Sequence, residues 1–223
     1  MKVEFNASLM YADFGNLAKE LRLLQDAGVD SFHIDIMDGR FVDNFAMSLC
    51  DLCFIAKAAK TPLDVHLMVE HPRVHIDKIL QHVRSGDTIY IHPESEYHPS
   101  TTLNRILAAG MVPGIAINPC TSIESVYEII HIAKKVMLMT VDPGEAGRPY
   151  LPFVEEKIKK LIHLKEQLGI KLYMDGACNK NRICSYAKQG VDGFVLGTSA
   201  LFLAHCNYKE KIKELRQGAV QGC

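Results

Sequence analysis

Short apolar segments alternate with longer amphipathic segments along the chain, and the alternation occurs eight times. The apolar segments have the length and composition of buried strands, and the amphipathic ones have the period of helices. The expected strands are 3–8, 31–37, 63–69, 87–92, 112–117, 135–141, 170–175 and 191–196. The expected helices are 13–27, 48–60, 72–83, a short one that ends at 109, then 121–131, 151–168, 179–188 and 208–216.

This pattern predicts one α/β domain that covers residues 1–223, a single (β/α)8 TIM barrel. A doubly wound open sheet is the alternative, but it usually has fewer strands and a GxGxxG motif after the first. No such motif follows residues 3–8, and no linker or low-complexity stretch divides the chain.

The second expected strand has an unusual inner face. His33, Asp35 and Met37 alternate with Ile34 and Ile36, so one face is polar and the other apolar. An imidazole and a carboxylate that face an interior need partners, and a metal ion is one such partner. A pair of buried polar residues that satisfy each other, or an edge strand with one solvated face, would give the same local pattern. The choice between these interpretations therefore depends on the other strands.

Similar side chains occur at the carboxyl ends of other strands, which is where barrel enzymes place their chemistry. His66 follows the same inward alternation in the third strand, and Asp175 ends the seventh. Each residue alone is more often structural, but His33, Asp35, His66 and Asp175 together predict a metal site. Nitrogen and oxygen ligands of this kind suit one divalent ion, Zn²⁺, Fe²⁺, Mn²⁺ or Co²⁺.

Glycines at the strand ends predict a second part of the site. Gly176 and Gly197 follow the seventh and eighth strands, where barrels often bind phosphate through backbone N–H groups. Gly144 and Gly147 could close over it as a loop. A glycine after a strand is usually only a turn residue, but the set favours a phosphorylated substrate.

Three methionines, Met37, Met68 and Met139, lie at the same expected rim. Methionine often serves as adaptable core filler. Next to metal ligands, a cap that excludes water from a flat intermediate is the competing interpretation.

Composition narrows the choice of partners and compartment. The net charge of −1 lacks the basic character of nucleic-acid-binding proteins, and no apolar stretch is long enough to span a membrane. The first residues lack a signal-peptide pattern, and the seven cysteines include no paired CxxC motifs. We therefore expect a cytoplasmic protein.

Five motifs resemble the ribulose-phosphate 3-epimerase family, and the resemblance extends from Ser8 to about Phe202. The motifs are HIDIMDG at 33–39, LDVHLMV at 63–69, MTVDPG at 139–144, MDG at 174–176 and LGTSALF at 196–202. The resemblance implies a barrel of the ribulose-phosphate-binding type and metal-dependent epimerisation at C3 of a ketose phosphate, by proton transfer through an enediolate, in a homo-oligomer.

The resemblance also implies roles for individual residues. Asp35 and Asp175 would be the two acid/base groups and would bind the metal together with His33 and His66. Ser8 and His66 would lie near the sugar. The implied phosphate contacts and their neighbours are Gly144, Glu145, Ala146, Gly147, Gly176, Ala177, Gly197, Thr198 and Ser199.

The chain departs from the family pattern at several positions. Asp43 replaces a proline, and 143–148 reads PGEAGR where the family usually has PGFxGQ. Arg148 could offset the charge of Glu145 or reach the phosphate itself. Ala177 replaces the second glycine of a Gly-Gly turn. Together with IHPE at 91–94 and GTS at 197–199, this turn resembles the branch that acts on allulose 6-phosphate, so five- and six-carbon substrates both stay open.

Two other functions fit a barrel of this kind less well. Decarboxylases of the orotidine-monophosphate type carry Asp-x-Lys-x-x-Asp on the third strand, whereas this chain has DVHLMV at 64–69. A non-catalytic barrel that binds sugar phosphates would be favoured by loss of an acid/base aspartate, and both Asp35 and Asp175 are present.

Overall fold

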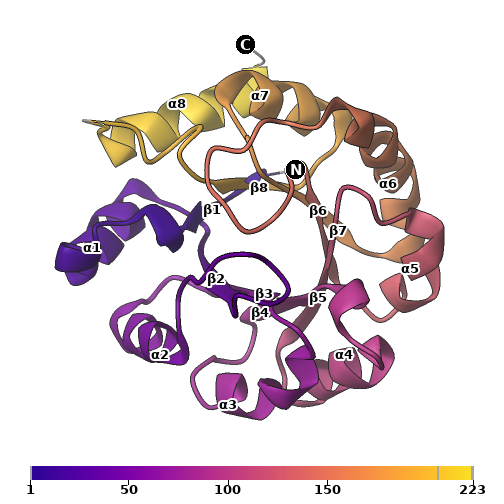
Figure 1. Ribbon diagram of the computed structural model, residues 1–223. Coiled ribbons are helices and arrows are strands. Elements are labelled where there is room, and N and C mark those ends of the chain that lie inside the picture. Colours follow the sequence, from indigo (N-terminus) through magenta and orange to yellow (C-terminus); the bar gives the residue numbers. More distant parts are fainter. Residues whose placement is uncertain (1, 205, 222–223) are drawn as a thin grey trace.

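Eight parallel strands close into a barrel in the computed structural model of the protein, which describes residues 2–204 and 206–221 (Figure 1). Each strand pairs with its neighbours in sequence, and the eighth pairs with the first. The strands are β1 (Glu4–Ser8), β2 (Ser31–Met37), β3 (Leu63–Met68), β4 (Thr88–Ile91), β5 (Val112–Ile117), β6 (Lys135–Met139), β7 (Lys171–Asp175) and β8 (Gly193–Leu196). The predicted (β/α)8 barrel is confirmed.

Helices surround the barrel on its outer side (Figure 1). They are α1 (Leu17–Ala27), α2 (Leu49–Ala58), α3 (Ile76–Leu80), α4 (Pro99–Ala108), α5 (Ile123–Ile130), α6 (Glu155–Leu168), α7 (Lys180–Gln189) and α8 (Tyr208–Gln221). The first begins later than expected, because Asp13 caps a separate 3-10 turn, Phe14–Asn16, before it. None of the helices in the described ranges combines the length and apolarity needed to cross a lipid bilayer.

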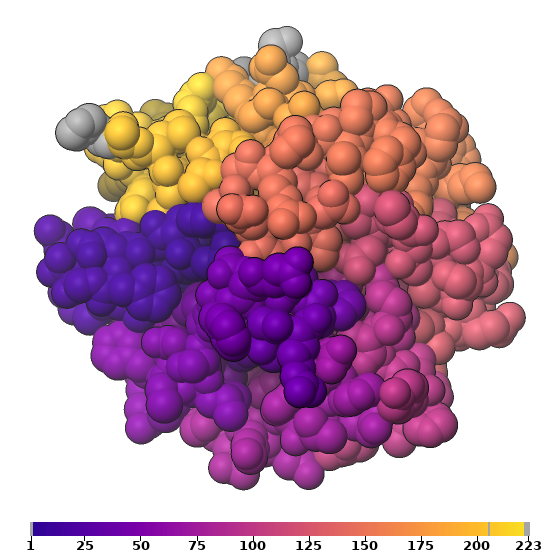
Figure 2. Space-filling view, in the orientation of Figure 1, coloured from indigo at the N-terminus to yellow at the C-terminus, as the bar shows by residue number. Residues whose placement is uncertain are grey.

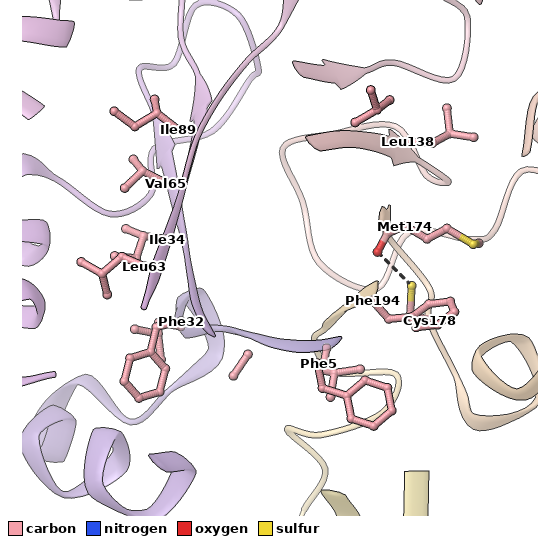
Figure 3. Packing of buried hydrophobic residues seen from close by; sticks show 14 of the residues in the cluster. Phe5, Phe32, Ile34, Leu63, Val65, Ile89, Leu138, Met174, Cys178 and Phe194 are labelled. Carbon is pink, nitrogen blue, oxygen red and sulfur yellow. Dashed lines mark hydrogen bonds between the residues drawn. The ribbon is translucent and has the colours of Figure 1, made fainter. Parts of the chain in front are cut away.

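The alternation of side chains divides each strand between two environments. Phe32 and Ile34 of β2 belong to the main apolar core between strands and helices, where Phe5, Val65 and Phe194 also lie (Figure 3). His33 and Asp35 lie on the opposite face of β2, inside the barrel, and are also buried. Burial of the outer face therefore directs the polar side chains of β2 inward.

The barrel end that holds the amino ends of the strands has its own polar cluster. The buried carboxylate of Asp64 accepts hydrogen bonds from Asn6 and from the Ser31 hydroxyl, the latter at 2.8 Å. Lys135 pairs with the other oxygen of Asp64 at 3.3 Å. The carboxylate of Asp64 is thus paired inside this end of the barrel, whereas binding sites of such barrels lie at the opposite end, the mouth.

Two loops meet over the mouth. The β2 loop (38–48) and the β6 loop (140–151) lie against each other at the centre of the face in Figures 1 and 2. Asn44 Nδ2 donates a hydrogen bond to the carbonyl oxygen of Gly144 at 2.7 Å. Gly144 has φ +104°, and an added Cβ would lie 2.7 Å from Val42, so glycine permits this close approach. The mouth is thus covered from two sides of the barrel.

Candidate metal and phosphate site

Four side chains from three strands converge inside the mouth. Each of His33, Asp35, His66 and Asp175 offers one ligand atom, and these four atoms all lie within 4.8 Å of one another. His33 and Asp35 both belong to β2, whereas His66 belongs to β3 and Asp175 to β7, far away in the sequence. Closure of the barrel therefore assembles the cluster.

The strand register explains the close contacts. Asp35 of β2 is the direct partner of His66 of β3, so their side chains point into the barrel at the same level. Asp175 is the partner of Met139 on the other side of the barrel. Its Oδ2 lies 4.0 Å from His33 Nε2 and 3.9 Å from His66 Nδ1. The two carboxylates thus approach the imidazoles from different sides.

The distances among three of the four atoms fit a divalent cation, and Asp175 Oδ2 lies farther from the two imidazole nitrogens, at 4.0 and 3.9 Å. Asp35 Oδ1 lies 3.1 Å from His66 Nδ1 and 3.3 Å from His33 Nε2, and the two nitrogens are 3.4 Å apart. A tetrahedral ion with bonds of about 2.1 Å requires ligand atoms about 3.4 Å apart. Nitrogen and oxygen donors at this spacing suit the ions that the sequence predicts.

Further contacts orient the ligand side chains. His66 Nε2 lies 2.8 Å from His92 Nε2, so one imidazole donates to the other. The Ser8 hydroxyl donates to Asp35 Oδ2 at 2.7 Å, which leaves Oδ1 directed at the imidazoles. Such partners fix the tautomer and the direction of a ligand. His33 Nδ1 is buried without a partner, so His33 has no comparable support.

The two carboxyl groups differ in acidity. Burial would raise the pKa of Asp35, but the charges and hydrogen bonds of His33 and His66 outweigh it and hold this pKa well below its ordinary value. Burial raises the pKa of Asp175, and the charge of Asp35 adds to the effect. Carboxyl groups whose pKa values are pushed apart are typical of acid/base pairs. A divalent ion between them would favour the ionised form of both.

The predicted site residues gather at one mouth. Every one of them lines it except His33 and His66, which lie fully buried behind Asp35. Met37 and Met68 pack with Val42 under the β2 loop, and Met139 packs inside the barrel. The methionines are thus both buried and exposed to the space where a substrate would lie, so the structure is compatible with either interpretation of them.

The turns after β6 and β7 that line the mouth contain glycines in the left-handed region. Gly144, Gly147 and Gly176 have φ values of +104°, +71° and +105°, in the region that favours glycine. An added Cβ at Gly176 would lie 2.6 Å from a methyl group of Val141. Turns of this kind allow backbone N–H groups to converge on an anion.

The altered β6 loop carries a charge pair. Arg148 Nε lies 3.6 Å from Glu145 Oε2, and both residues line the mouth. Arg148 therefore offsets the charge of Glu145, the first of the two roles that the sequence left open for it.

Sequence reasoning missed several residues at the mouth. Tyr11 lines it, and its ring lies 3.3 Å from the position of a Cβ at Gly197. Burial, and then the charges of Asp35 and Asp175, raise the pKa of the Tyr11 hydroxyl. Tyr11 belongs to a short 3-10 turn, Leu9–Tyr11, directly after β1. In the sequence, only its position three residues after Ser8, at the carboxyl end of the first strand, could have indicated that Tyr11 lies at the mouth.

Comparison with known proteins identifies the same family that the sequence motifs resemble. The profile of the Ribulose-phosphate 3 epimerase family matches residues 4–202. A ribulose-phosphate 3-epimerase from Methanocaldococcus jannaschii is 34% identical over 221 residues, 98% of this chain and 92% of the relative. One from Helicobacter pylori strain J99 is 37% identical over 193 residues, 86% of this chain and 87% of the relative.

Solved structures agree with the fold. Thiamine phosphate pyrophosphorylase from Pyrococcus furiosus superposes with a TM-score of 0.65 at 16% identity, and the match covers 99% of this chain and 97% of that one. At this identity the likeness supports the barrel fold alone.

Proposed function

This chain belongs to the ribulose-phosphate 3-epimerase family, and we propose that it inverts C3 of a ketose phosphate by proton transfer between Asp35 and Asp175. Its relatives are named as epimerases, and the chain is an isomerase of the same class.

The observation that carries the mechanism is the pair of carboxylates at the mouth. Inversion of a carbon next to a carbonyl requires removal of a proton from one face and return of a proton to the other. Asp35 comes from β2 and Asp175 from β7, and both line the mouth. A planar enediolate between them would be reached by one carboxylate from each face.

His33, Asp35, His66 and Asp175 would hold the metal ion. A bound divalent ion would supply Lewis-acid stabilisation of the negative charge that develops on the C2 and C3 oxygens. Ser8 keeps Asp35 in place through its 2.7 Å hydrogen bond. The β2 and β6 loops, which are joined by the Asn44–Gly144 hydrogen bond, would shield the reacting carbon from water.

The phosphate of the substrate would bind opposite the metal. Gly176, Ala177 and Gly197 line the mouth beside the β6 loop, and their backbone N–H groups would bind the phosphate. The names of the relatives favour ribulose 5-phosphate, and the GA turn at 176–177 favours the six-carbon allulose 6-phosphate. Both compounds present the same C2 carbonyl, C3 hydroxyl and terminal phosphate.

An exchange experiment tests the proposal. The purified protein is incubated with ribulose 5-phosphate and, separately, with allulose 6-phosphate in D₂O, and deuterium at C3 is followed by NMR. We expect incorporation together with formation of the epimer, and the ratio of kcat/KM values identifies the substrate. Binding of both compounds without exchange would contradict the proposal and favour a non-catalytic sugar-phosphate-binding barrel.

Metal removal provides a second test. Chelation should abolish exchange, and Zn²⁺, Fe²⁺, Mn²⁺ or Co²⁺ added singly should restore it to different extents. Full activity in a sample shown by mass spectrometry to be free of metal would remove the ion from the mechanism.

We also propose that the barrel acts as a single catalytic domain, forms a homo-oligomer and works in the cytoplasm. Light scattering of the purified protein tests the second of these.

A further inference from the structure

Ala177 has a backbone conformation that alanine seldom adopts. Its φ is +49°, in the left-handed region, and His71 is the one other non-glycine residue with positive φ in the described ranges. For a residue with a Cβ this conformation costs about 1 kcal/mol or more. Ala177 lines the mouth directly after Gly176. Other contacts must therefore hold it in place.

Arg182 supplies such a contact. Its Nη1 donates a hydrogen bond to the carbonyl oxygen of Ala177 at 2.9 Å. The backbone N–H of Asn179 donates to the same oxygen at 2.9 Å. Arg182 is itself fixed, because its backbone N–H donates to Asn179 Oδ1 at 3.0 Å in the N-cap of α7. Two donors thus define the orientation of the peptide that follows Ala177.

The same guanidinium also contacts Tyr150, near the end of the β6 loop. Its central carbon lies 4.1 Å from the ring centre of Tyr150, a distance at which cation and ring attract each other. The Tyr150 hydroxyl lies 2.9 Å from the hydroxyl of Tyr186 on α7. Tyr150 comes two residues after Arg148, which lines the mouth. Arg182 therefore connects both segments that border the phosphate end.

We propose that Arg182 is a positioning residue, which holds Ala177 in its left-handed conformation so that the N–H groups of 176–177 face the substrate phosphate. It lies behind the wall of the mouth, since Ala177 and Gly176 line the mouth and Arg182 does not. It acts through the backbone and does not bind the phosphate itself. The proposal rests on the proposed function, because it assumes that a phosphate binds at this turn.

The first experiment compares Arg182→Met with Lys188→Met. Both variants lose one positive charge on α7, but Lys188 is exposed on its last turn. Loss of a charge-assisted hydrogen bond should raise KM for the ketose phosphate, and the dissociation constant of inorganic phosphate, by roughly tenfold. The turnover number kcat should change by less than about threefold, because Arg182 does not contact the reacting carbon. Lys188→Met should match the wild type.

A second substitution distinguishes positioning from a direct effect of charge. Glycine adopts positive φ at little cost, so Ala177→Gly added to Arg182→Met should lower both constants again by several-fold. If Arg182 attracted the phosphate by its charge, glycine at 177 would restore nothing, and that result would overturn the proposal. Unchanged constants in Arg182→Met, with a folded protein by circular dichroism, would overturn it too.

Inorganic phosphate separates this inference from the proposed function. Calorimetric binding of phosphate requires no turnover. Wild-type protein that binds phosphate but shows no exchange at C3 would contradict the proposed function, and the variants would still test Arg182. Wild-type protein that binds no phosphate would overturn the inference.

Discussion

Asp175→Asn tests the two-carboxylate mechanism most directly, because the structure separates its consequences from those of Asp35→Asn. Asp175 has its nearest cluster contacts at 3.9 and 4.0 Å, and its side chain is 16% exposed. An amide of the same shape therefore disturbs its neighbours little. Loss of one proton carrier should lower kcat for epimerisation by about 10²–10⁴-fold.

Asp35→Asn should have a larger effect. Asp35 Oδ2 accepts the hydrogen bond of the Ser8 hydroxyl at 2.7 Å, and Oδ1 lies 3.1 Å from His66 Nδ1. An amide in this position places a donor against one of these groups, which costs roughly 1–3 kcal/mol more. That free energy corresponds to a further factor of about 5–150.

The assay follows deuterium at C3 from each epimer separately in D₂O. Asp175→Asn should still exchange the proton of one epimer through Asp35, without inversion, and leave the other epimer inert. Asp35→Asn should show the opposite preference. Metal content must be measured in both variants, since both residues would bind the ion, and Asp26→Asn on the exposed face of α1 serves as a control. Interconversion by Asp175→Asn within tenfold of the wild-type rate would refute the mechanism.

Three further predictions follow from single contacts. Ser8→Ala removes a 2.7 Å hydrogen bond to a carboxylate and should lower kcat by about tenfold in steady-state assays. Gly176→Ala places a Cβ 2.6 Å from Val141 at φ +105°, so we expect a melting temperature several degrees lower. Burial would raise the pKa of Glu96, but bonds from Arg73 outweigh it and lower this pKa from 4.5. Its ionised form thus stabilises the fold above about pH 4.5, and denaturation curves of Glu96→Gln should show a smaller loss of stability on acidification.

The histidine–aspartate cluster could be predicted from the sequence because it lies on strands. Side chains alternate along a strand, so burial of Phe32 and Ile34 on the outer face places His33 and Asp35 on the inner one. The order of eight parallel strands then fixes which carboxyl ends meet. Local pattern and closure of the barrel are together sufficient to bring Asp175 to the same cluster.

Helix boundaries were less accurate for a physical reason. The helix expected at 13–27 begins at Leu17, because Asp13 accepts a hydrogen bond from Gly15 and stabilises a 3-10 turn instead. The last helix continues to Gln221 rather than ending at 216. Apolar periodicity shows which residues face the core, but the ends of a helix depend on single capping contacts.

The sequence predicted the glycines of the proposed phosphate end but not the contacts that shape it. Those contacts join loops that are distant in the sequence. Asn44 holds the carbonyl of Gly144, and Arg182 holds that of Ala177 and stacks on Tyr150. No periodic pattern specifies such pairs, since loops lack the repeat that a strand or helix provides.

This division between strands and loops has a consequence for the choice of substrate. Atoms C2 and C3 are the same in the five- and six-carbon ketose phosphates, so the cluster on the strands would treat both alike. The two compounds differ in the distance from C3 to the phosphate, and in the proposed binding mode the β6 loop and the turn at 176–177 would accommodate this difference. Three of the departures from the family pattern, Glu145, Arg148 and Ala177, lie in these two segments. Substitutions there should therefore change the ratio of kcat/KM between the two substrates, whereas substitutions in the cluster should lower both values in parallel.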